Sequence, residues 1–366
     1  MNISIEKKTF IEAVYKVSRF AERKSTTLPA LASVLVVAND EGIKMRATNL
    51  ETGVDLTVQG VCKTSGVVAI PAALLQQIAS SLSGSGVVTL EHTGDVLSLT
   101  SDSSKSSIKT VPYEDFPLIP LPERSENTFT IAGTTLRTVF TSVAACASIS
   151  TVRPELASLY LIIEGGVLTA VATDSFRLAE KKFPISQKGL QGKLLIPAKN
   201  ALEIAQALPD NEIQVVFDEH QCAFITSNGA IVSRLTNANY PDYKQIIPKE
   251  SVAGAVVLRK DIEQALKHTA IFSDTFQKVS VQFESKKNTL TLYAKNPDLG
   301  ESLENINAKL DGEALTLSFN HRFLTTVFNL TNAESISLHA AGIGRPLIMR
   351  GVGDNSLLYL ISPMNQ

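Results

Sequence analysis

The chain has little of what marks several common classes of protein. Its 366 residues include no tryptophan, only 6% aromatic residues and three cysteines. Cys62, Cys146 and Cys222 lie far apart and form no CxxC pair, a pattern that favours reduced thiols over a disulfide framework. We therefore expect a mostly aliphatic core and a cytoplasmic location.

Long hydrophobic runs and common catalytic motifs are missing as well. No uncharged apolar run reaches the roughly 18 residues that a bilayer-spanning helix needs, and Glu6, Lys7 and Lys8 stand where a signal sequence would be apolar. The five histidines are scattered, and there is no HExxH motif, phosphate-binding loop or GxSxG elbow. These absences predict a soluble protein without a membrane segment, a metal site or a cofactor, and they argue against an enzyme.

What the sequence does contain is a threefold internal repeat. Three kinds of segment each recur at a spacing of about 125 residues and in the same order, which chance similarity would not produce. Division of the chain by three gives copies of about 120 residues, the size of a self-sufficient domain. The recurring segments are IPAALLQQIASSL at 70–82, IPAKNALEIAQAL at 196–208 and FNHRFLTTVFNL at 319–330; KTFIEAVYKV at 8–17, TTLRTVFTSV at 134–143 and KDIEQALKHT at 260–269; and RATNLE at 46–51, VATDSF at 171–176 and LYAKNP at 292–297.

Each copy has the pattern of two helices with many short strands between them. Apolar residues recur at helical spacing in six segments, with Thr9 as an N-cap and with Pro71 and Pro197 in first helical turns. The intervening runs are rich in Val, Ile, Leu and Thr, and hairpin turns are expected at 165–167 and 227–230. The expected fold is α+β with antiparallel sheets, not a doubly wound parallel sheet. The predicted helices are 8–21, 71–82, 135–147, 197–208, 260–272 and 321–330.

Two polar, proline-bearing segments fall where the repeat requires domain boundaries. They are PLIPLPERSEN at 117–127 and PKESVAG at 248–254. We therefore predict three domains of one fold, at 1–121, 128–248 and 254–366.

The net charge is only −2, but the charge is unevenly spread. The six helical segments carry more Lys and Arg than Asp and Glu, and the rest of the chain carries the opposite excess. Basic helices on a mildly acidic frame suit binding of a polyanion. A plainer interpretation stays open, because much of the excess comes from residues 7–24 and a lysine-rich helix face is often only a solvated face.

Asp174 and Arg177, in the segment VATDSFRLAE, are the strongest acid–base pair in the sequence. Their spacing suits either catalysis or a buried ion pair that closes a hairpin. The ion pair is the preferred interpretation, because catalytic groups in a triplicated protein would be expected to leave some repeated trace, and none is found.

Six segments carry motifs that occur together, and in this order, in one known family. The ATD-x-x-RLA, YPDY and terminal Pro-Met elements must all coincide with the three-domain period, so the combination is highly specific. On these motifs the chain resembles, over its whole length, the bacterial DNA polymerase sliding clamps, the family of the DNA polymerase III β subunit. The motif segments are TTLPALASVLV at 26–36, TVPYEDFP at 110–117, VATDSFRLAE at 171–180, LIPAKNALEIAQAL at 195–208, NYPDYKQIIPK at 239–249 and LISPMNQ at 360–366.

The resemblance implies a non-catalytic processivity factor of the replicative DNA polymerase. Two chains would close head to tail into a homodimeric ring of six domains, with antiparallel sheets outside and helices lining a hole. Double-stranded DNA of any sequence would pass through the hole. An ATP-driven clamp loader would place the ring on DNA, and the polymerase and other clamp-binding proteins would dock on it.

The resemblance also implies three groups of site residues. A cleft between the second and third domains would bind client peptides, basic residues on or near the helices would contact DNA, and the first domain would meet the third domain of the partner chain. Phe176, Gln245, Ser362 and Ser106 depart from common family members, which bears on peptide preference and dimer strength. The peptide-binding residues would be Leu156, Thr173, Ser175, Phe176, Arg177, Leu178, Pro241, Ile246, Asn320, Phe323, Pro346, Leu347, Leu360, Ile361, Ser362, Pro363 and Met364; the DNA-binding residues Lys24, Arg153 and Lys199, with Arg23, Arg137 and Lys260 as further candidates on helices; and the dimer-interface residues Ser106, Ile108, Ile271 and Phe272.

Two other hypotheses compete with the clamp. An enzyme on a repeated α+β scaffold would use Asp174 and Arg177, and Asp174→Asn would then abolish a substrate-dependent activity. A passive scaffold would bind proteins and no DNA, and neutralising Lys24 and Lys199 would then change nothing.

Overall fold

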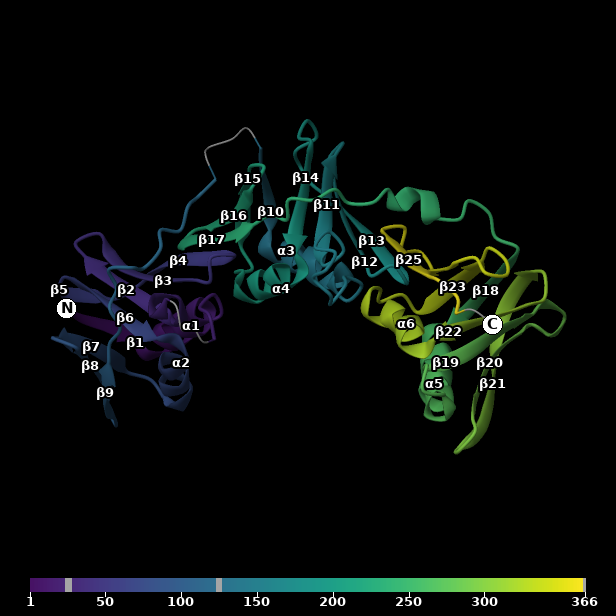
Figure 1. Ribbon diagram of the computed structural model, residues 1–366, viewed down its shortest axis with the longest axis horizontal. Coiled ribbons are helices and arrows are strands. Elements are labelled where there is room, and N and C mark those ends of the chain that lie inside the picture. Colours follow the sequence, from purple (N-terminus) through teal and green to yellow (C-terminus); the bar gives the residue numbers. More distant parts are fainter. Residues whose placement is uncertain (24–27, 123–126, 365–366) are drawn as a thin grey trace. The chain divides into compact units, whose positions relative to one another are not determined.

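The computed structural model describes residues 1–23, 28–122 and 127–364. They contain six α-helices and 25 strands, together with short 3-10 turns. Every strand pair within the three sheets is antiparallel. The predicted α+β class is therefore confirmed (Figure 1).

The described residues form two compact units. The first comprises residues 1–138 and 199–236, and the second residues 139–198 and 237–366. Each unit combines part of the central repeat with one flanking repeat, because the central repeat contributes strands to a sheet in each unit. The predicted domain boundaries stay a prediction.

The first unit is built mostly from strands, with two helices packed together beside them. The helix α1 packs against α2 and against β3 and β4 (Figure 1). The elements of this unit are β1 (Asn2–Glu6), α1 (Lys7–Ser18), β2 (Ser33–Asn39), β3 (Gly42–Thr48), β4 (Thr52–Val58), β5 (Val61–Thr64), β6 (Gly66–Pro71), α2 (Ala72–Ser81), β7 (Val87–Thr93), β8 (Val96–Thr100), β9 (Lys105–Lys109), β10 (Thr128–Ala132), the start of α3 (Gly133–Ala144), all but the first residue of α4 (Ala198–Ala207), β15 (Glu212–Phe217), β16 (Gln221–Thr226) and β17 (Gly229–Arg234).

These strands form two sheets. One has the order β5-β1-β7-β8-β9, and the other has the order β10-β15-β16-β17-β4-β3-β2-β6. In the second sheet β17 pairs with β4, with Ser233 opposite Thr52. A strand of the central repeat and a strand of the first repeat are thus hydrogen-bonded neighbours.

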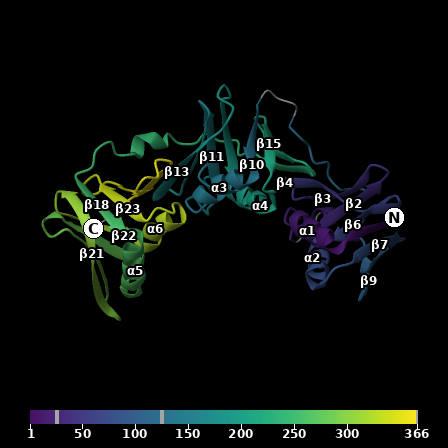
Figure 2. The same cartoon turned by 180° about the vertical axis from the view of Figure 1, so that it is seen from behind.

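The second unit has the same character. Its helix α5 packs against α6 and against strands β20 and β21, as Figure 2 shows from behind. The elements are the end of α3, β11 (Ser158–Glu164), β12 (Val167–Thr173), β13 (Arg177–Pro184), β14 (Gly192–Pro197), the 3-10 turn η2 (Tyr243–Ile246), β18 (Ala253–Leu258), α5 (Arg259–Thr269), η3 (Ala270–Phe272), β19 (Lys278–Glu284), β20 (Thr289–Asn296), β21 (Gly300–Gly312), β22 (Leu315–Asn320), α6 (His321–Thr326), η5 (Val327–Asn329), β23 (Ser335–Ala340), β24 (Leu347–Gly351) and β25 (Leu357–Ile361).

One sheet joins the strands of the second unit. Its order is β14-β11-β12-β13-β25-β24-β23-β18-β21-β20-β19-β22. The join between the repeats is the pair β13–β25, in which Arg177 lies opposite Ile361 and Leu178 opposite Leu360. This join positions the candidate site.

All six predicted helices are present, and most of their ends shift by a few residues. Two details of the prediction were wrong. Thr9 lies inside α1, where its hydroxyl donates to Glu6 Oε2 at 3.1 Å, and Glu6 is the N-cap residue. Pro71 and Pro197 end the strands before α2 and α4, because their backbone is still extended there. The spacing of apolar residues predicted the helices correctly, while the pairing of the preceding strands determined the residues at which they begin.

The predicted hairpin turns are confirmed. Gly165 and Gly166, with φ of 60° and 78°, join β11 to β12, and Gly229, with φ of 151°, opens β17 after β16. A side chain at Gly229 would place its Cβ 2.1 Å from the carbonyl oxygen of Asp55, so the close approach of β17 to β4 requires glycine.

The described residues have a mostly aliphatic core, as the scarcity of aromatic residues predicts. The three cysteines are unpaired, and burial raises the pKa of the Cys146 thiol to about 12, which leaves it unreactive. Within the described residues, every helix is too short or too polar to span a bilayer. Nor do three His, Cys, Asp or Glu side chains of this part of the chain come together as a metal ion requires.

Candidate peptide-binding site

The hairpin turn between β12 and β13 is held by its own side chains. Asp174 Oδ1 accepts hydrogen bonds from the amides of Phe176 and Arg177, both at 3.0 Å. Thr173 Oγ1 donates to the carbonyl oxygen of Arg177 at 2.7 Å and accepts from the Ser175 amide at 3.2 Å. Ser175 adopts a left-handed conformation with φ of 78°. The turn therefore presents Ser175 and Phe176 to solvent in a fixed geometry.

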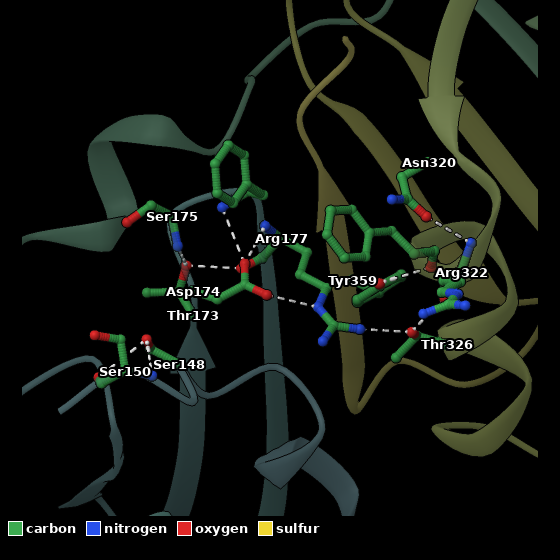
Figure 3. A network of polar contacts seen from close by, with 12 residues as sticks. Ser148, Ser150, Thr173, Asp174, Ser175, Arg177, Asn320, Arg322, Thr326 and Tyr359 are labelled. Carbon is green, nitrogen blue, oxygen red and sulfur yellow. Dashed lines mark hydrogen bonds and ion pairs between the residues drawn. The ribbon is translucent and has the colours of Figure 1, made fainter. Parts of the chain in front are cut away.

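Arg177 links this turn to the third repeat (Figure 3). Its Nε donates to Asp174 Oδ2 at 2.9 Å, and its Nη1 donates to Thr326 Oγ1 at 2.8 Å. The guanidinium carbon lies 4.7 Å from the centre of the Phe323 ring. The preferred interpretation of Asp174 and Arg177, an ion pair closing a hairpin, is confirmed, but the pair is half-buried and not fully buried: the two side chains are 16% and 18% exposed.

The charge state of Arg177 follows from these contacts. Burial by itself disfavours the charged guanidinium, but the hydrogen bond to Asp174 and the interactions with neighbouring acidic groups outweigh it, so the pKa of Arg177 lies above its ordinary value. A permanently charged guanidinium can orient its neighbours through its donors, but it has no proton to exchange in acid–base chemistry.

An aromatic rim stands above this polar network. The rings of Phe176 and Phe323 are stacked, with centres 6.5 Å apart, and Phe176 is 62% exposed. Tyr359 is fully buried beneath, and its hydroxyl donates to the carbonyl oxygen of Phe323 at 2.8 Å. Asn320 caps α6 by accepting from the Arg322 amide at 2.9 Å (Figure 3). Both aromatic rings are thus available to an apolar ligand on a rigid base.

A second group of apolar residues lies across the β13–β25 join. Leu178 and Leu360 form its buried centre, and Tyr243 from the YPDY motif packs onto them. The Tyr243 hydroxyl donates to Glu180 Oε2 at 2.6 Å, which ties the segment after β17 to the sheet. Tyr240 from the same motif stacks on Tyr160 at 4.6 Å between ring centres.

The C-terminal tail closes the site on its remaining side. The Ser362 amide donates to the carbonyl oxygen of Phe176, and the Met364 amide donates to that of Ser318, both at 2.8 Å. Ser362, Pro363 and Met364 are half-buried. The tail is therefore fixed by its backbone, and its side chains are left partly free for contacts.

The structure brings the predicted peptide-binding residues together in one unit, in three degrees of burial. The buried ones can only support a ligand from below, while the exposed and half-buried ones can touch it. Their role in binding stays a prediction. Those buried are Leu156, Thr173, Leu178, Leu347, Leu360 and Ile361; those half-buried are Arg177, Asn320, Phe323, Pro346, Ser362, Pro363 and Met364; and those exposed are Ser175, Phe176, Pro241 and Ile246.

Several residues that shape the site were not predicted. Thr326 and Tyr359 hold Arg177 and Phe323 in place, and Glu180 anchors Tyr243. The first two have no local signal in the sequence, because each acts on a partner that is distant in the chain. Tyr243 could have been found, since it belongs to the YPDY motif.

The predicted DNA-binding residues have different surroundings. Lys199 on α4 and Lys260 on α5 are exposed. Arg153 is also exposed, in the turn before β11, and bonds Glu155 at 2.9 Å. Arg137 donates to two carbonyl oxygens at the end of α4, those of Ala205 and Leu208, and to Asp210. Its guanidinium thus caps a helix terminus.

The two remaining DNA candidates, Arg23 and Lys24, follow α1 in the sequence. The prediction that Arg23 lies on a helix was wrong, because α1 ends at Ser18 and Arg23 follows in an exposed bend. Lys24 lies outside the described residues.

The predicted dimer-interface residues are also unlike one another. Ile271 is 61% exposed in η3, and Phe272 beside it is half-buried. Ile108 is buried at 2% exposure within its own unit, and Ser106 is half-buried next to it on β9. β9 is an edge strand of its sheet, so its outer edge offers backbone groups with which a strand of a partner chain could pair.

Sequence comparison now identifies the class of protein. Three family models match in succession: DNA polymerase III beta subunit, N-terminal domain at residues 1–120, central domain at 130–242 and C-terminal domain at 244–365. The chain therefore belongs to the DNA polymerase III beta subunit family, and the resemblance inferred from the motifs is confirmed.

Individual relatives agree along the full length. The chain is 26% identical to a beta sliding clamp of Halalkalibacterium halodurans, covering 100% of this chain and 99% of the relative. It is 25% identical to a beta sliding clamp of Pseudomonas aeruginosa, covering 100% of both.

Solved structures share the fold. The beta subunit of DNA polymerase III from Thermotoga maritima matches with a TM-score of 0.93 at 25% identity, covering 100% of this chain and 99% of that one. A Pseudomonas aeruginosa clamp bound to griselimycin matches with a TM-score of 0.94 at 24% identity, covering 100% of both.

Proposed function

We propose that this chain is a processivity factor of a replicative DNA polymerase, a non-catalytic homodimeric clamp that encloses duplex DNA and docks client proteins. An ATP-driven loader would open and close it, and the cytoplasm would be its location. The observation that carries the proposal is the site at the β13–β25 join, where exposed Phe176 and half-buried Phe323 and Met364 surround an apolar floor.

The site suits the apolar side chains of a short peptide. Phe176 and Phe323 offer ring faces, and Met364 is a flexible side chain that can adapt to different partners. The Arg177 guanidinium, itself held by its hydrogen bond to Thr326, lies over the Phe323 ring and keeps the ring in place before a ligand arrives, which lowers the ordering cost of binding. Such a site can serve several client proteins in turn.

A sequence-independent hold on DNA needs only a few cations. Lys199 and Lys260 are exposed on α4 and α5, and Lys8 and Lys16 add positive charge to α1. Contacts to phosphates position a protein without reading sequence, and each one that is lost lowers the salt dependence of binding by about one counterion. Weak contacts of this kind permit sliding, while ring closure would prevent dissociation.

Sedimentation equilibrium on a micromolar-to-nanomolar dilution series tests the oligomer. We expect a mass twice the 39.4 kDa of the chain. A persistent monomer that is not retained on closed circular DNA in the presence of a loader would refute the clamp.

Peptide binding tests the site. Met364→Ala should weaken the binding of a client peptide by about 1–3 kcal/mol, because the site loses an apolar side chain. The dimer should stay intact, because Met364 is not among the predicted interface residues Ile271 and Phe272. Exposed Ile343→Ala, whose side chain is 74% exposed, is the matched control and should leave affinity unchanged. Full-strength binding to Met364→Ala would mean that the cleft is wrongly assigned.

The comparisons give no support to the enzyme hypothesis. Asp174 accepts the bonds that hold the turn, and Arg177 bonds both Asp174 and Thr326 of α6, which gives the pair a structural role. Asp174→Asn should therefore reduce peptide binding by loosening the turn, and no substrate turnover should depend on it.

A further inference from the structure

The turn between β3 and β4, at Thr48–Thr52, repeats the hydrogen bonds of the turn at Thr173–Arg177. Thr48 Oγ1 donates to the carbonyl oxygen of Thr52 at 2.8 Å and accepts from the Leu50 amide at 3.1 Å. Asn49 Oδ1 accepts from the amides of Glu51 and Thr52, at 3.0 and 2.7 Å. Leu50 takes the left-handed conformation, with φ of 71°, that Ser175 takes in the other turn.

The neighbouring strand joins are also alike. The Arg234 amide at the end of β17 donates to the carbonyl oxygen of Glu51 at 2.8 Å. The Ser362 amide, just after β25, makes the same bond to Phe176 at the same distance. The β4–β17 join in the first unit is thus built in the same way as the join that carries the candidate peptide site.

The two joins differ in what covers them. The position of Leu178 in the peptide site corresponds to Gly53 in the first unit. The side chain of Ile119 fills the space above Gly53, because a Cβ added at Gly53 would lie 2.8 Å from Ile119 Cγ2. The segment after the first repeat therefore crosses the join with Ile119 seated on β4. Leu118 and Leu121 on either side of it are 91% and 54% exposed.

Two cavities remain beside Ile119. One of about 150 Å³ is lined by Leu50, Thr52, Leu118 and Arg234, and one of about 300 Å³ is lined by Lys44, Leu121 and Ile225. Ile119 and Val232 line both. Together the cavities reach the range of sizes that hold ligands in proteins.

The charges around these cavities favour an acidic ligand. Asp55 lines the larger cavity but is paired with Arg46 at 2.8 Å. Lys44 in the larger cavity and Arg234 in the smaller one have no carboxylate partner among the described residues, and Glu51 in the smaller cavity is the opposing charge. With Asp55 neutralised by Arg46, the net charge of the side chains that line the two cavities is +1. Lys44 carries a positive charge in the larger cavity, where no unpaired carboxylate is present among the described lining residues.

We propose that this groove at the β4–β17 join, lined by Lys44, Leu50, Ile119, Leu121, Val232 and Arg234, is a second docking site for an extended client peptide. The peptide would place apolar side chains in the two cavities and an acidic side chain against Lys44. The inference rests on the proposed function for its client proteins, and on the repeated turn and the cavities for its location. It gives each chain two peptide sites of unequal character.

The experiment uses the full chain and a synthetic peptide that carries one aspartate followed by Leu-Val-Leu between Gly-Ser flanks. Calorimetric titration gives the number of sites, and a benzophenone group on the peptide marks them by photo-crosslinking. We expect two sites per chain, with crosslinks at 118–121 or 225–234 for the second. Leu121→Asp should weaken that site at least about tenfold, because it places a carboxylate in the apolar wall of the cavity that Lys44 also lines, where it repels the aspartate of the peptide.

Val61→Asp is the matched control. Val61 is 60% exposed on β5 of the same unit and lines neither cavity, so its replacement should change nothing. Lys44→Gln should weaken the aspartate peptide and leave its asparagine counterpart unaffected, which separates charge recognition from a change of shape.

The outcomes separate this inference from the proposed function. Loss of one site in Leu121→Asp and of the other in Met364→Ala supports both. A single site that responds only to Met364→Ala overturns the second docking site and leaves the proposed cleft standing. A single site that responds only to Leu121→Asp supports the groove and overturns the cleft. No binding, or crosslinks outside the groove alone, overturns the inference.

Discussion

Replacement of Arg177 by methionine should loosen the candidate peptide site by a predictable amount. The side chain makes three contacts at once: with Asp174 at 2.9 Å, with Thr326 at 2.8 Å and with the face of the Phe323 ring at 4.7 Å. Methionine has a similar length and can still pack on the ring, so the change removes mainly the charge and its hydrogen bonds.

The magnitude follows from these contacts. A hydrogen bond to a charged group contributes about 1.5–3 kcal/mol, and a cation over an aromatic ring about 0.5–1 kcal/mol at a partly exposed site. The Arg177 and Asp174 side chains are 18% and 16% exposed, so solvent screens part of this interaction. The retained packing offsets a further part. A net loss of about 2–3 kcal/mol in the local free energy of opening is therefore expected.

Native-state hydrogen exchange measures this loss where it occurs. Amides in the turn at 173–177 and in α6 should exchange about 30- to 150-fold faster in Arg177→Met, because both are held by the same guanidinium. Client-peptide affinity should fall in parallel, since Phe323 loses its support. Arg345→Met is the control: Arg345 is exposed, and its side chain makes no ion pair or hydrogen bond within the described part of the chain.

Equal exchange rates of these amides in Arg177→Met and Arg345→Met would contradict the prediction. The prediction also fails if acceleration is confined to the turn and leaves α6 unchanged. In that case the hydrogen bond from Arg177 to Thr326 would not stabilise α6.

Three further predictions concern other contacts. Tyr243→Phe removes the 2.6 Å bond to Glu180 and should lower Tm by about 2–4 °C, while Tyr113→Phe, at an exposed position, should not. Burial, and to a smaller extent the charge of Arg322, lower the pKa of His321 below 6.5, so the unfolded chain binds a proton at this residue more readily than the folded chain does. The contribution of His321 to stability should therefore be complete above pH 6.5 and fall as the pH drops below that value. Urea titrations at pH 7.5 and 5.5 measure this difference, and His321→Gln should remove it. Gly229→Ala would place a Cβ 2.1 Å from Asp55 O and should speed proteolysis of the first unit, whereas Gly189→Ala, with open space around it, should not; equal proteolysis would mean that β17 can shift freely.

Hydrophobic periodicity and turn residues gave the local structure correctly. Six helices, the hairpins at Gly165-Gly166 and Gly229, and the ion pair of Asp174 with Arg177 all depend on residues within a few positions of one another. Such short-range patterns are set by backbone geometry and can be read without knowledge of the rest of the molecule. The resemblance of motifs then identified the family, which the comparisons confirmed.

Residues that act at long range escaped prediction for one physical reason. Thr326 lies 149 positions from Arg177, and Tyr359 lies 36 positions from Phe323. Nothing in the neighbourhood of Thr326 marks its hydroxyl as an acceptor for a distant guanidinium. Arg137 was a further candidate for DNA as a basic residue on a helix, and nothing in the sequence indicates that its side chain also caps α4. Charge can be counted in a sequence, but the use of a charge depends on what packs against it.

The sequence by itself determined the threefold repeat, the α+β class, the helices and the family of this chain, because these rest on local patterns that recur. Only the tertiary structure decided that strands of neighbouring repeats pair directly, β4 with β17 and β13 with β25. Those pairings create both the candidate peptide site and the second groove. Backbone hydrogen bonds between strands carry no residue-specific signature, so the partner of an edge strand is set by the packing of the whole unit.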